Sequence, residues 1–257
     1  MENRIHLQSL KAILSYPFKQ PEWQTTYLIL ALLVFGGFII PVLPWLVVGG
    51  YFAAVLRRAA ASDDLPEMPD LKDWGALLVD GLRQFGVGFI LNLPIGLLYA
   101  CGFGVYFFSM VGSILASESG SRGGEAFFPL FMMGGMGVWL LALGIALLLT
   151  LLIALFFPVI SAHVAVKQSF PAMFRVREWA RLLRKGIGGY AAAMVVVIGV
   201  YGLMLVVSQV TFMIPFLCGL YPFILGARVP WLIGVAGVLF GKAYREANEP
   251  VSDPAEE

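Results

Sequence analysis

Residues 138–157 read VWLLALGIALLLTLLIALFF and contain no charged side chain. Fourteen of these residues are Leu, Ile, Val or Phe. Each of them contributes about −0.3 to −0.6 kcal/mol to membrane insertion, so the stretch gains roughly −4 to −8 kcal/mol. Because about 20 apolar residues in a helix cross the hydrocarbon core of a bilayer, the stretch predicts a membrane-spanning helix.

The whole chain has a composition typical of membrane proteins. Of its 257 residues, 60% are hydrophobic and 13% are charged, whereas soluble domains have about 45–50% apolar and about 25% charged residues. So few charges could not cover the surface of an aqueous core. The net charge of +1 gives no indication of nucleic-acid binding. We therefore predict an all-α fold, a polytopic membrane helical bundle.

The apolar residues form five blocks, from which we expect five to six hydrophobic segments. The blocks cover residues 27–56, 85–110, 127–166, 187–207 and 220–240. Cys101 and Cys218 lie in apolar runs and are interpreted as small packing residues. The glycine pairs in 134–137 and 237–241 would allow close helix approach.

The first two blocks contain candidate structural breaks. Pro41 and Pro44 block a continuous helix in the first, because proline removes a backbone donor. A single kinked span and a helix–break–helix hairpin both fit this block, and we favour the hairpin. Asn92 and Pro94 in the second block indicate either an unwound half-helix that meets a solute or a proline kink. We favour the kink, with Asn92 bonding the freed carbonyl or a neighbouring helix.

Lys and Arg residues gather in particular hydrophilic stretches. The 167–185 stretch holds six basic residues against Glu178 alone, and the 57–83 stretch holds four. Lys242 and Arg245 follow the last block. The positive-inside tendency places these stretches and the C-terminus in the cytoplasm.

Two connections carry little or no basic charge and are predicted to lie outside the cytoplasm. The 117–124 loop contains only Arg122, and the 208–218 connection contains no Lys or Arg. A hairpin at 27–56 returns the N-terminus to the cytoplasm, whereas a single span leaves it outside. Residues 1–245 are predicted to form one membrane-embedded helical domain, followed by a disordered polar tail at 246–257.

Both long hydrophilic stretches end in the pattern W-x-x-L-L-x-x-G-[LI]-x-x-[FY], at 74–85 and 179–190. Trp and Leu share one helical face opposite the charges, which predicts two amphipathic interfacial helices. Candidate lipid-facing residues are Trp74, Arg83, Trp179, Arg181, Arg184 and Lys185. The shared pattern would fit an internal repeat of 27–110 and 127–207, but it does not require one. Alternatively, any helix entering a membrane from the cytoplasm has this order of residues.

No catalytic, cofactor-binding or metal-binding site is predicted. His6 and His163 have no Cys or carboxylate at metal-ligand spacing, and His163 is interpreted as an interfacial histidine. No apolar block is expected to carry a charge near its centre, which weighs against proton-coupled transport. Asp73 and Asp80 share a helical face and are interpreted as a helix cap and a solvated carboxylate.

Four sequence features resemble a known family. They are Tyr16-Pro17-Phe18 with Trp23, Gly50-Tyr51 with Arg57, Asp64-Leu65-Pro66-Glu67 before Asp73-Trp74-Gly75 and Asp80-Gly81-Leu82, and Gly241-Lys242-Ala243-Tyr244-Arg245. They resemble the prokaryotic membrane proteins of the domain-of-unknown-function family numbered four thousand and thirteen. The resemblance implies a prokaryotic cytoplasmic membrane and a compact multi-helix domain, but no activity. The 167–185 stretch is more basic here than in the family pattern.

We therefore expect an integral membrane protein that is not an enzyme. Its expected partners are the lipid bilayer, including anionic lipids, and a membrane protein or a second copy of itself. Nucleic acid is not an expected partner. The alternative is a small-solute transporter or channel component, which rests on the candidate breaks and the repeat.

Overall fold

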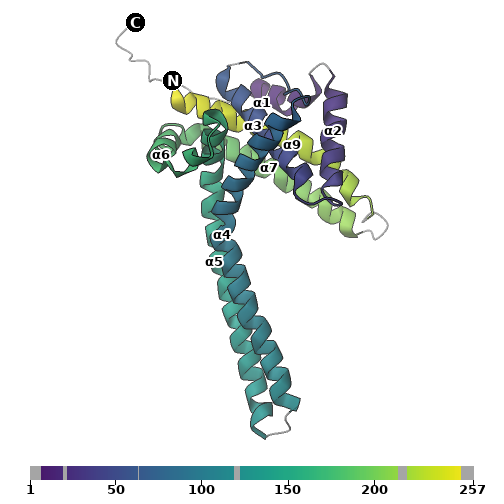
Figure 1. Ribbon diagram of the computed structural model, residues 1–257, viewed down its shortest axis with the longest axis vertical. Helices are drawn as coiled ribbons and strands as arrows, with labels where there is room; N and C mark the ends of the chain where they lie inside the picture. The colour runs from purple at the N-terminus through teal and green to yellow at the C-terminus, as the bar shows by residue number, and fades with distance from the viewer. Residues whose placement is uncertain (1–6, 20–21, 63, 119–121, 214–218, 250–257) are drawn as a thin grey trace. The chain divides into compact units, whose positions relative to one another are not determined.

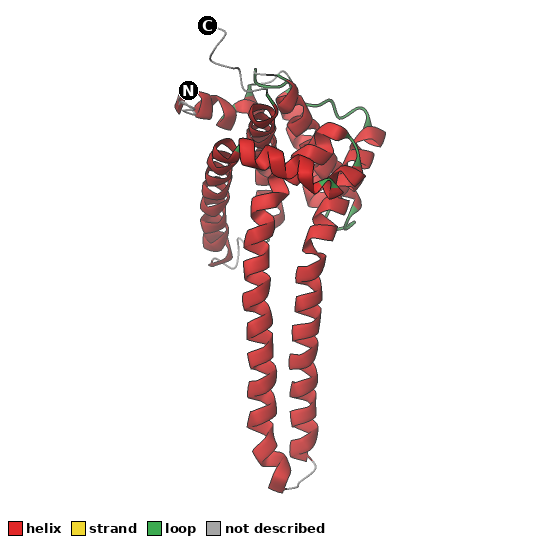
Figure 2. Cartoon of the chain, turned by 90° about the vertical axis from the view of Figure 1, so that its left-hand side faces the viewer, coloured by secondary structure: helices red, strands yellow, loops and turns green. Residues whose placement is uncertain are grey.

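The computed structural model describes residues 7–19, 22–62, 64–118, 122–213 and 219–249, which form helices joined by loops, with no β-strand among them (Figure 2). The prediction of an all-α fold is confirmed. The α-helices are α1 (Leu7–Leu14), α2 (Trp23–Gly36), α3 (Leu43–Ala61), α4 (Trp74–Glu118), α5 (Arg122–Lys167), α6 (Val176–Lys185), α7 (Ile187–Met213) and α9 (Tyr221–Asn248). Two short 3-10 helices are η1 (Tyr16–Phe18) and η2 (Phe170–Phe174).

Four of the described helices, α4, α5, α7 and α9, are long and apolar enough to cross a membrane. Three of them expose large apolar side chains that water would not favour: Phe108 of α4 is 74% exposed, Leu141 of α5 65% and Val195 of α7 72%. Lipid tails can surround such side chains at no cost. With α2 and α3, these helices make up six hydrophobic segments, and the chain is a membrane protein.

The first apolar block is a helix–break–helix element. α2 ends at Gly36 and α3 begins at Leu43, so Pro41 lies between the two helices. Pro44 falls in the first turn of α3, where a missing N–H breaks no helical hydrogen bond. α2 has 14 residues and is about 21 Å long, less than the roughly 30 Å of a hydrocarbon core.

The second candidate break is absent, because α4 continues through Asn92 and Pro94. The side-chain amide of Asn92 donates a hydrogen bond of 2.8 Å to the carbonyl of Gly88, one turn earlier. The carbonyl freed by Pro94 is that of Ile90, so Asn92 does not bond it as expected. A long helix tolerates the loss of one hydrogen bond when the turns on both sides persist.

The last helix, α9, extends further toward the C-terminus than predicted. α9 continues to Asn248, so residues 246–248 are helical rather than part of a tail. Arg245 lies 2.9 Å from the carboxylate of Glu249, and this ion pair holds the last turn. Residues 250–257 and Cys218 lie outside the described residues.

The chain divides into two compact units, of which one is Gly88–Phe157. In it α4 and α5 run side by side (Figure 1). A Cβ added at Gly102 would lie 2.6 Å from the Cβ of Ala142, and one added at Gly135 would lie 2.6 Å from the Cβ of Ser109. Small residues thus let the two helices approach closely. The internal repeat and the single domain remain predictions.

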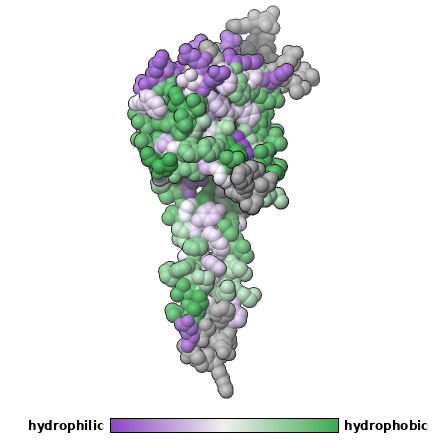
Figure 3. Space-filling model, turned by 90° about the vertical axis from the view of Figure 1, so that its right-hand side faces the viewer, coloured by the Kyte–Doolittle hydropathy of each residue, from purple (hydrophilic) through white to green (hydrophobic). Residues whose placement is uncertain are grey.

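The other unit runs to Val87 and resumes at Pro158. Its central element is α9, which contacts α2, α3, α6 and α7. A Cβ at Gly237 would lie 2.8 Å from Val55, and one at Gly241 would lie 2.5 Å from the backbone oxygen of Leu56. The GxxxG spacing of α9 is therefore a packing surface for α3, as expected. On the face in Figure 3, hydrophilic side chains of this unit gather along one edge, next to a largely hydrophobic region.

Candidate functional site

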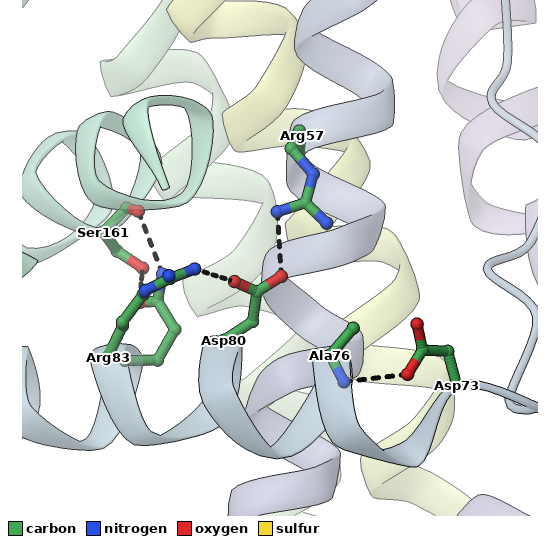
Figure 4. A network of polar contacts seen from close by, with 7 residues as sticks. Arg57, Asp73, Ala76, Asp80, Arg83 and Ser161 are labelled. Carbon is green, nitrogen blue, oxygen red and sulfur yellow. Dashed lines mark hydrogen bonds and ion pairs between the residues drawn. The ribbon is translucent and has the colours of Figure 1, made fainter. Parts of the chain in front are cut away.

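A buried carboxylate joins α3 and α4. Asp80 accepts hydrogen bonds from Arg57 at 2.8 Å and from Arg83 at 2.6 Å (Figure 4), and its side chain is 8% exposed. The expectation that Asp80 is solvated was wrong, because α3 brings Arg57 onto the face of α4 that carries Asp80. Asp73 does cap α4, since its Oδ1 accepts a bond of 3.0 Å from the backbone N–H of Ala76.

The opening turns of α4 expose part of the predicted lipid-facing side, while Asp80 on the opposite side is turned into the protein, and the interfacial placement of these turns stays a prediction. Trp74 and Leu82 are exposed, at 43% and 60%, and Leu77 is buried. Arg83, a candidate lipid-facing residue, is instead bound to Asp80. The signal that sequence reasoning passed over is the Arg57-Arg58 pair, which supplies a partner for a carboxylate on the next helix.

A second polar cluster joins α4, α5, α6 and α9. Gln84 and Ser161 exchange two hydrogen bonds, of 3.2 Å from the Gln84 amide and 2.5 Å from the Ser161 hydroxyl. His163 is 1% exposed and its Nδ1 lies 3.1 Å from the hydroxyl of Tyr244. Its Nε2 lies 3.2 Å from the carboxylate of Glu178. Ser161 thus pairs with Gln84 and not with the neighbouring histidine, so the cluster links helices rather than assembling a nucleophile and a base.

Helix α6 presents its basic residues outward. Leu182 is buried, and a Cβ at Gly186 would lie 2.6 Å from Ala247 of α9. The Trp179 indole N–H donates to the carbonyl of Met173 at 3.0 Å, and its ring is half-buried. Trp179 is thus anchored to the protein through its indole N–H, and its contact with lipid stays a prediction. The exposed basic residues of this basic face are Arg177, Arg181, Arg184 and Lys185.

The basic face borders a shallow surface groove of about 700 Å³. Val176 and Ala180 lie between the basic side chains along it. Glu178, the one acidic residue of α6, is turned toward His163 and Arg175 and does not line the groove. The groove therefore combines positive charge with a narrow apolar strip, which suits the headgroup region of an anionic lipid.

One charged residue inside a candidate span was missed. Arg228 lies in α9, within the apolar block at 220–240, and contradicts the expectation that no block carries a charge near its centre. It donates to the carbonyl of Met204 at 2.9 Å and to the hydroxyl of Ser208, both on α7. The signal was a lone Arg in an otherwise apolar run, opposite a Ser in the preceding run.

No group of three His, Cys, Asp or Glu side chains within the described ranges is arranged to hold a metal ion. Helical secondary structure, four long apolar helices and polar clusters that join helices define an all-α, polytopic membrane protein.

Residues 32–218 match the family described as "Protein of unknown function (DUF4013)", and this match covers most of the chain. The chain belongs to that family, as its sequence features indicated. Neither the comparison with curated proteins nor that with solved structures gave a match.

Proposed function

We propose that this protein is a non-enzymatic module of a prokaryotic cytoplasmic membrane, whose helix α6 binds anionic lipid headgroups at the cytoplasmic surface. The observation that carries the proposal is the basic face of α6, directly before the candidate span α7. Each Lys or Arg near an anionic surface gains about 1 kcal/mol. The buried Leu182 and the bonded Trp179 fix the helix, so little side-chain ordering offsets this gain.

The transporter alternative rests on the candidate breaks at Pro41/Pro44 and Asn92/Pro94 and on the repeat, and one of these supports, an unwound segment around Asn92 and Pro94, is not found. α4 is helical there, and the Asn92 side chain bonds its own helix. The proposal therefore assigns no solute path to this segment.

Replacing one arginine of the basic face should weaken lipid binding measurably. We expect Arg184→Gln to lower the affinity for phosphatidylglycerol about fivefold, the equivalent of about 1 kcal/mol, and Arg177→Gln/Arg181→Gln/Arg184→Gln to lower it by about two orders of magnitude. The full chain in a neutral detergent is titrated with the lipid, and bound lipid is counted by native mass spectrometry.

Lys72→Gln is the matched control, because Lys72 is 90% exposed and belongs to the loop before α4 rather than to α6. It should leave the affinity unchanged. If the triple variant binds phosphatidylglycerol as tightly as the wild type does, the basic face does not bind lipid. An acidic protein would then be the better candidate for its partner.

The proposed topology places both termini and the basic face in the cytoplasm. α2 is too short for a full crossing, which supports a hairpin of α2 and α3 that enters and returns on one side. In intact cells, an impermeant maleimide should therefore label Gly219→Cys and not Lys19→Cys or Lys72→Cys. The parent chain carries Cys101→Ala and Cys218→Ala, so that each test cysteine is alone. Labelling of Lys19→Cys without labelling of Lys72→Cys would indicate a single span instead.

A further inference from the structure

The guanidinium of Arg228 is only partly satisfied by the protein. Its Nη1 donates to the Met204 carbonyl and the Ser208 hydroxyl. Its Nη2 is buried and makes no hydrogen bond to the residues that the structure describes. A guanidinium carries five N–H donors and no acceptor, and a buried donor without a partner costs free energy. The donors of Nη2 are therefore available to a further acceptor.

The positive charge of Arg228 has no counter-ion near it on its two helices. The sequence from Trp179 to Arg245, which includes α7 and α9 up to Arg245, contains no Asp or Glu, and Glu246 lies 18 residues further along α9 than Arg228. Arg228 forms no ion pair with any described residue, unlike Arg57 and Arg83, which share Asp80. Both of its acceptors are neutral. A charge inside a membrane span is costly unless it is paired, so an external anion would stabilise this arrangement.

A cavity of about 80 Å³ lies beside Arg228 between α7 and α9. Tyr201, Ser208 and Tyr221, which carry hydroxyl groups, also line it. At roughly 30 Å³ for each water molecule, the cavity has room for one phosphate or carboxylate group and not for a nucleotide. Bidentate hydrogen bonding suits a guanidinium to such oxyanions.

The position of the cavity favours an anion carried by a lipid. Arg228 lies seven residues after Tyr221, about 10 Å along α9, which is a quarter of the way along the 28-residue candidate span. Leu205 and Tyr201 line the cavity and are themselves 45% and 50% exposed on α7, so apolar surface surrounds the opening. A lipid phosphate reaches this depth together with its acyl chains, whereas a free phosphate ion must leave water.

We propose that the cavity between α7 and α9 binds the phosphate group of a phospholipid through Arg228, with Nη2 supplying the unused donors. This site is separate from the basic face of α6 and does not depend on it. It differs in kind as well, because the phosphate is partly enclosed between two helices rather than held at an exposed surface. Salt screens exposed charges much more than buried ones, so binding at Arg228 should persist at salt concentrations that release lipid from α6.

The test uses the full chain in a neutral detergent, equilibrated with phosphatidylglycerol at low and at high salt, with bound lipid counted by native mass spectrometry. We expect one lipid to remain bound at high salt in the wild type, and its occupancy to fall at least tenfold in Arg228→Gln. A diacylglycerol with the same chains and no phosphate should not occupy the site. Arg181→Gln, on the basic face, should bind less lipid than the wild type at low salt and the same amount at high salt.

A second variant tests the same cavity in case Arg228→Gln does not fold. Leu205→Trp keeps the arginine and enlarges a lipid-exposed side chain at the cavity, so it should also release the lipid that resists salt. If both variants retain that lipid as the wild type does, the proposal is wrong. It is equally wrong if inorganic phosphate binds to the wild type and not to Arg228→Gln while phosphatidylglycerol does not bind there.

Discussion

Gly81→Ala should unfold or severely destabilise the protein. A Cβ at this position would lie 1.7 Å from the backbone oxygen of Leu46 on α3, and one at Gly50 would lie 1.9 Å from the backbone oxygen of Leu77 on α4. The two helices therefore touch backbone to backbone, and each glycine faces a carbonyl that no rotamer change can move aside. Overpacking a well-packed contact typically costs about 1–3 kcal/mol, and this contact involves main chain, so we expect at least about 3 kcal/mol.

The measurement is thermal unfolding in detergent, followed by circular dichroism and by the fraction that elutes as a single species. Gly88→Ala is the control on the same helix, because an added Cβ there meets no atom within 4 Å. Alanine favours helix by about 1 kcal/mol over glycine, so this variant should be as stable as the wild type or more so. Equal melting temperatures for Gly81→Ala and the wild type would show that α3 and α4 do not cross at this point.

Asp80→Asn should have the second large effect. It leaves Arg57 and Arg83 facing each other without the carboxylate that both now bind. Breaking a buried ion pair by removing one partner costs about 3–5 kcal/mol, because an uncompensated charge remains. The Arg side chains are 30% and 29% exposed, and partial solvation should keep the loss near the lower end of this range.

The double variant Arg57→Gln/Asp80→Asn should recover part of the stability lost in Asp80→Asn, since it removes one of the two opposed charges. Asp70→Asn is the matched control. Asp70 also pairs with a base, Lys72 at 3.2 Å, but its side chain is 59% exposed, and exposed pairs contribute little. If Asp70→Asn lowers the melting temperature as much as Asp80→Asn does, burial does not explain the contribution of the Asp80 ion pairs to stability.

The helices of the fold could be predicted because a membrane-spanning helix is recognisable from its own stretch of sequence. The length and apolarity of the run at 138–157 are enough to predict a membrane-spanning helix. The break between α2 and α3 was visible for the same reason, as Pro41 and Pro44 stand three positions apart in the sequence. Helix caps are equally local, and Asp73 was found where expected.

The pairing of residues from different helices could not be read in the same way. Nothing near Asp80 in the sequence shows that Arg57, 23 residues earlier, lies beside it. The same holds for His163 and Tyr244, 81 residues apart. Helical periodicity gave Asp80 the correct face, but whether that face meets water or another helix depends on how α3 and α4 cross.

The residues that carry the family resemblance lie largely at such contacts. Gly50 and Gly81 form the crossing of α3 and α4, and Gly241 lies against α3. Asp80 binds Arg57, and Tyr244 contacts His163. In this chain these residues hold helices together.

The helices of the unit Gly88–Phe157 belong to charge-free stretches of unusual extent. No Asp, Glu, Lys or Arg occurs from 84 to 117 or from 126 to 166. At 1.5 Å per residue these stretches reach about 51 and about 61 Å, against about 30 Å of hydrocarbon and about 40–45 Å of bilayer with headgroups. Such hydrophobic mismatch is relieved when helices tilt or when the surrounding lipids stretch. Lipids with longer acyl chains should therefore gather around this unit. The tilt of its helices should change with the thickness of the bilayer.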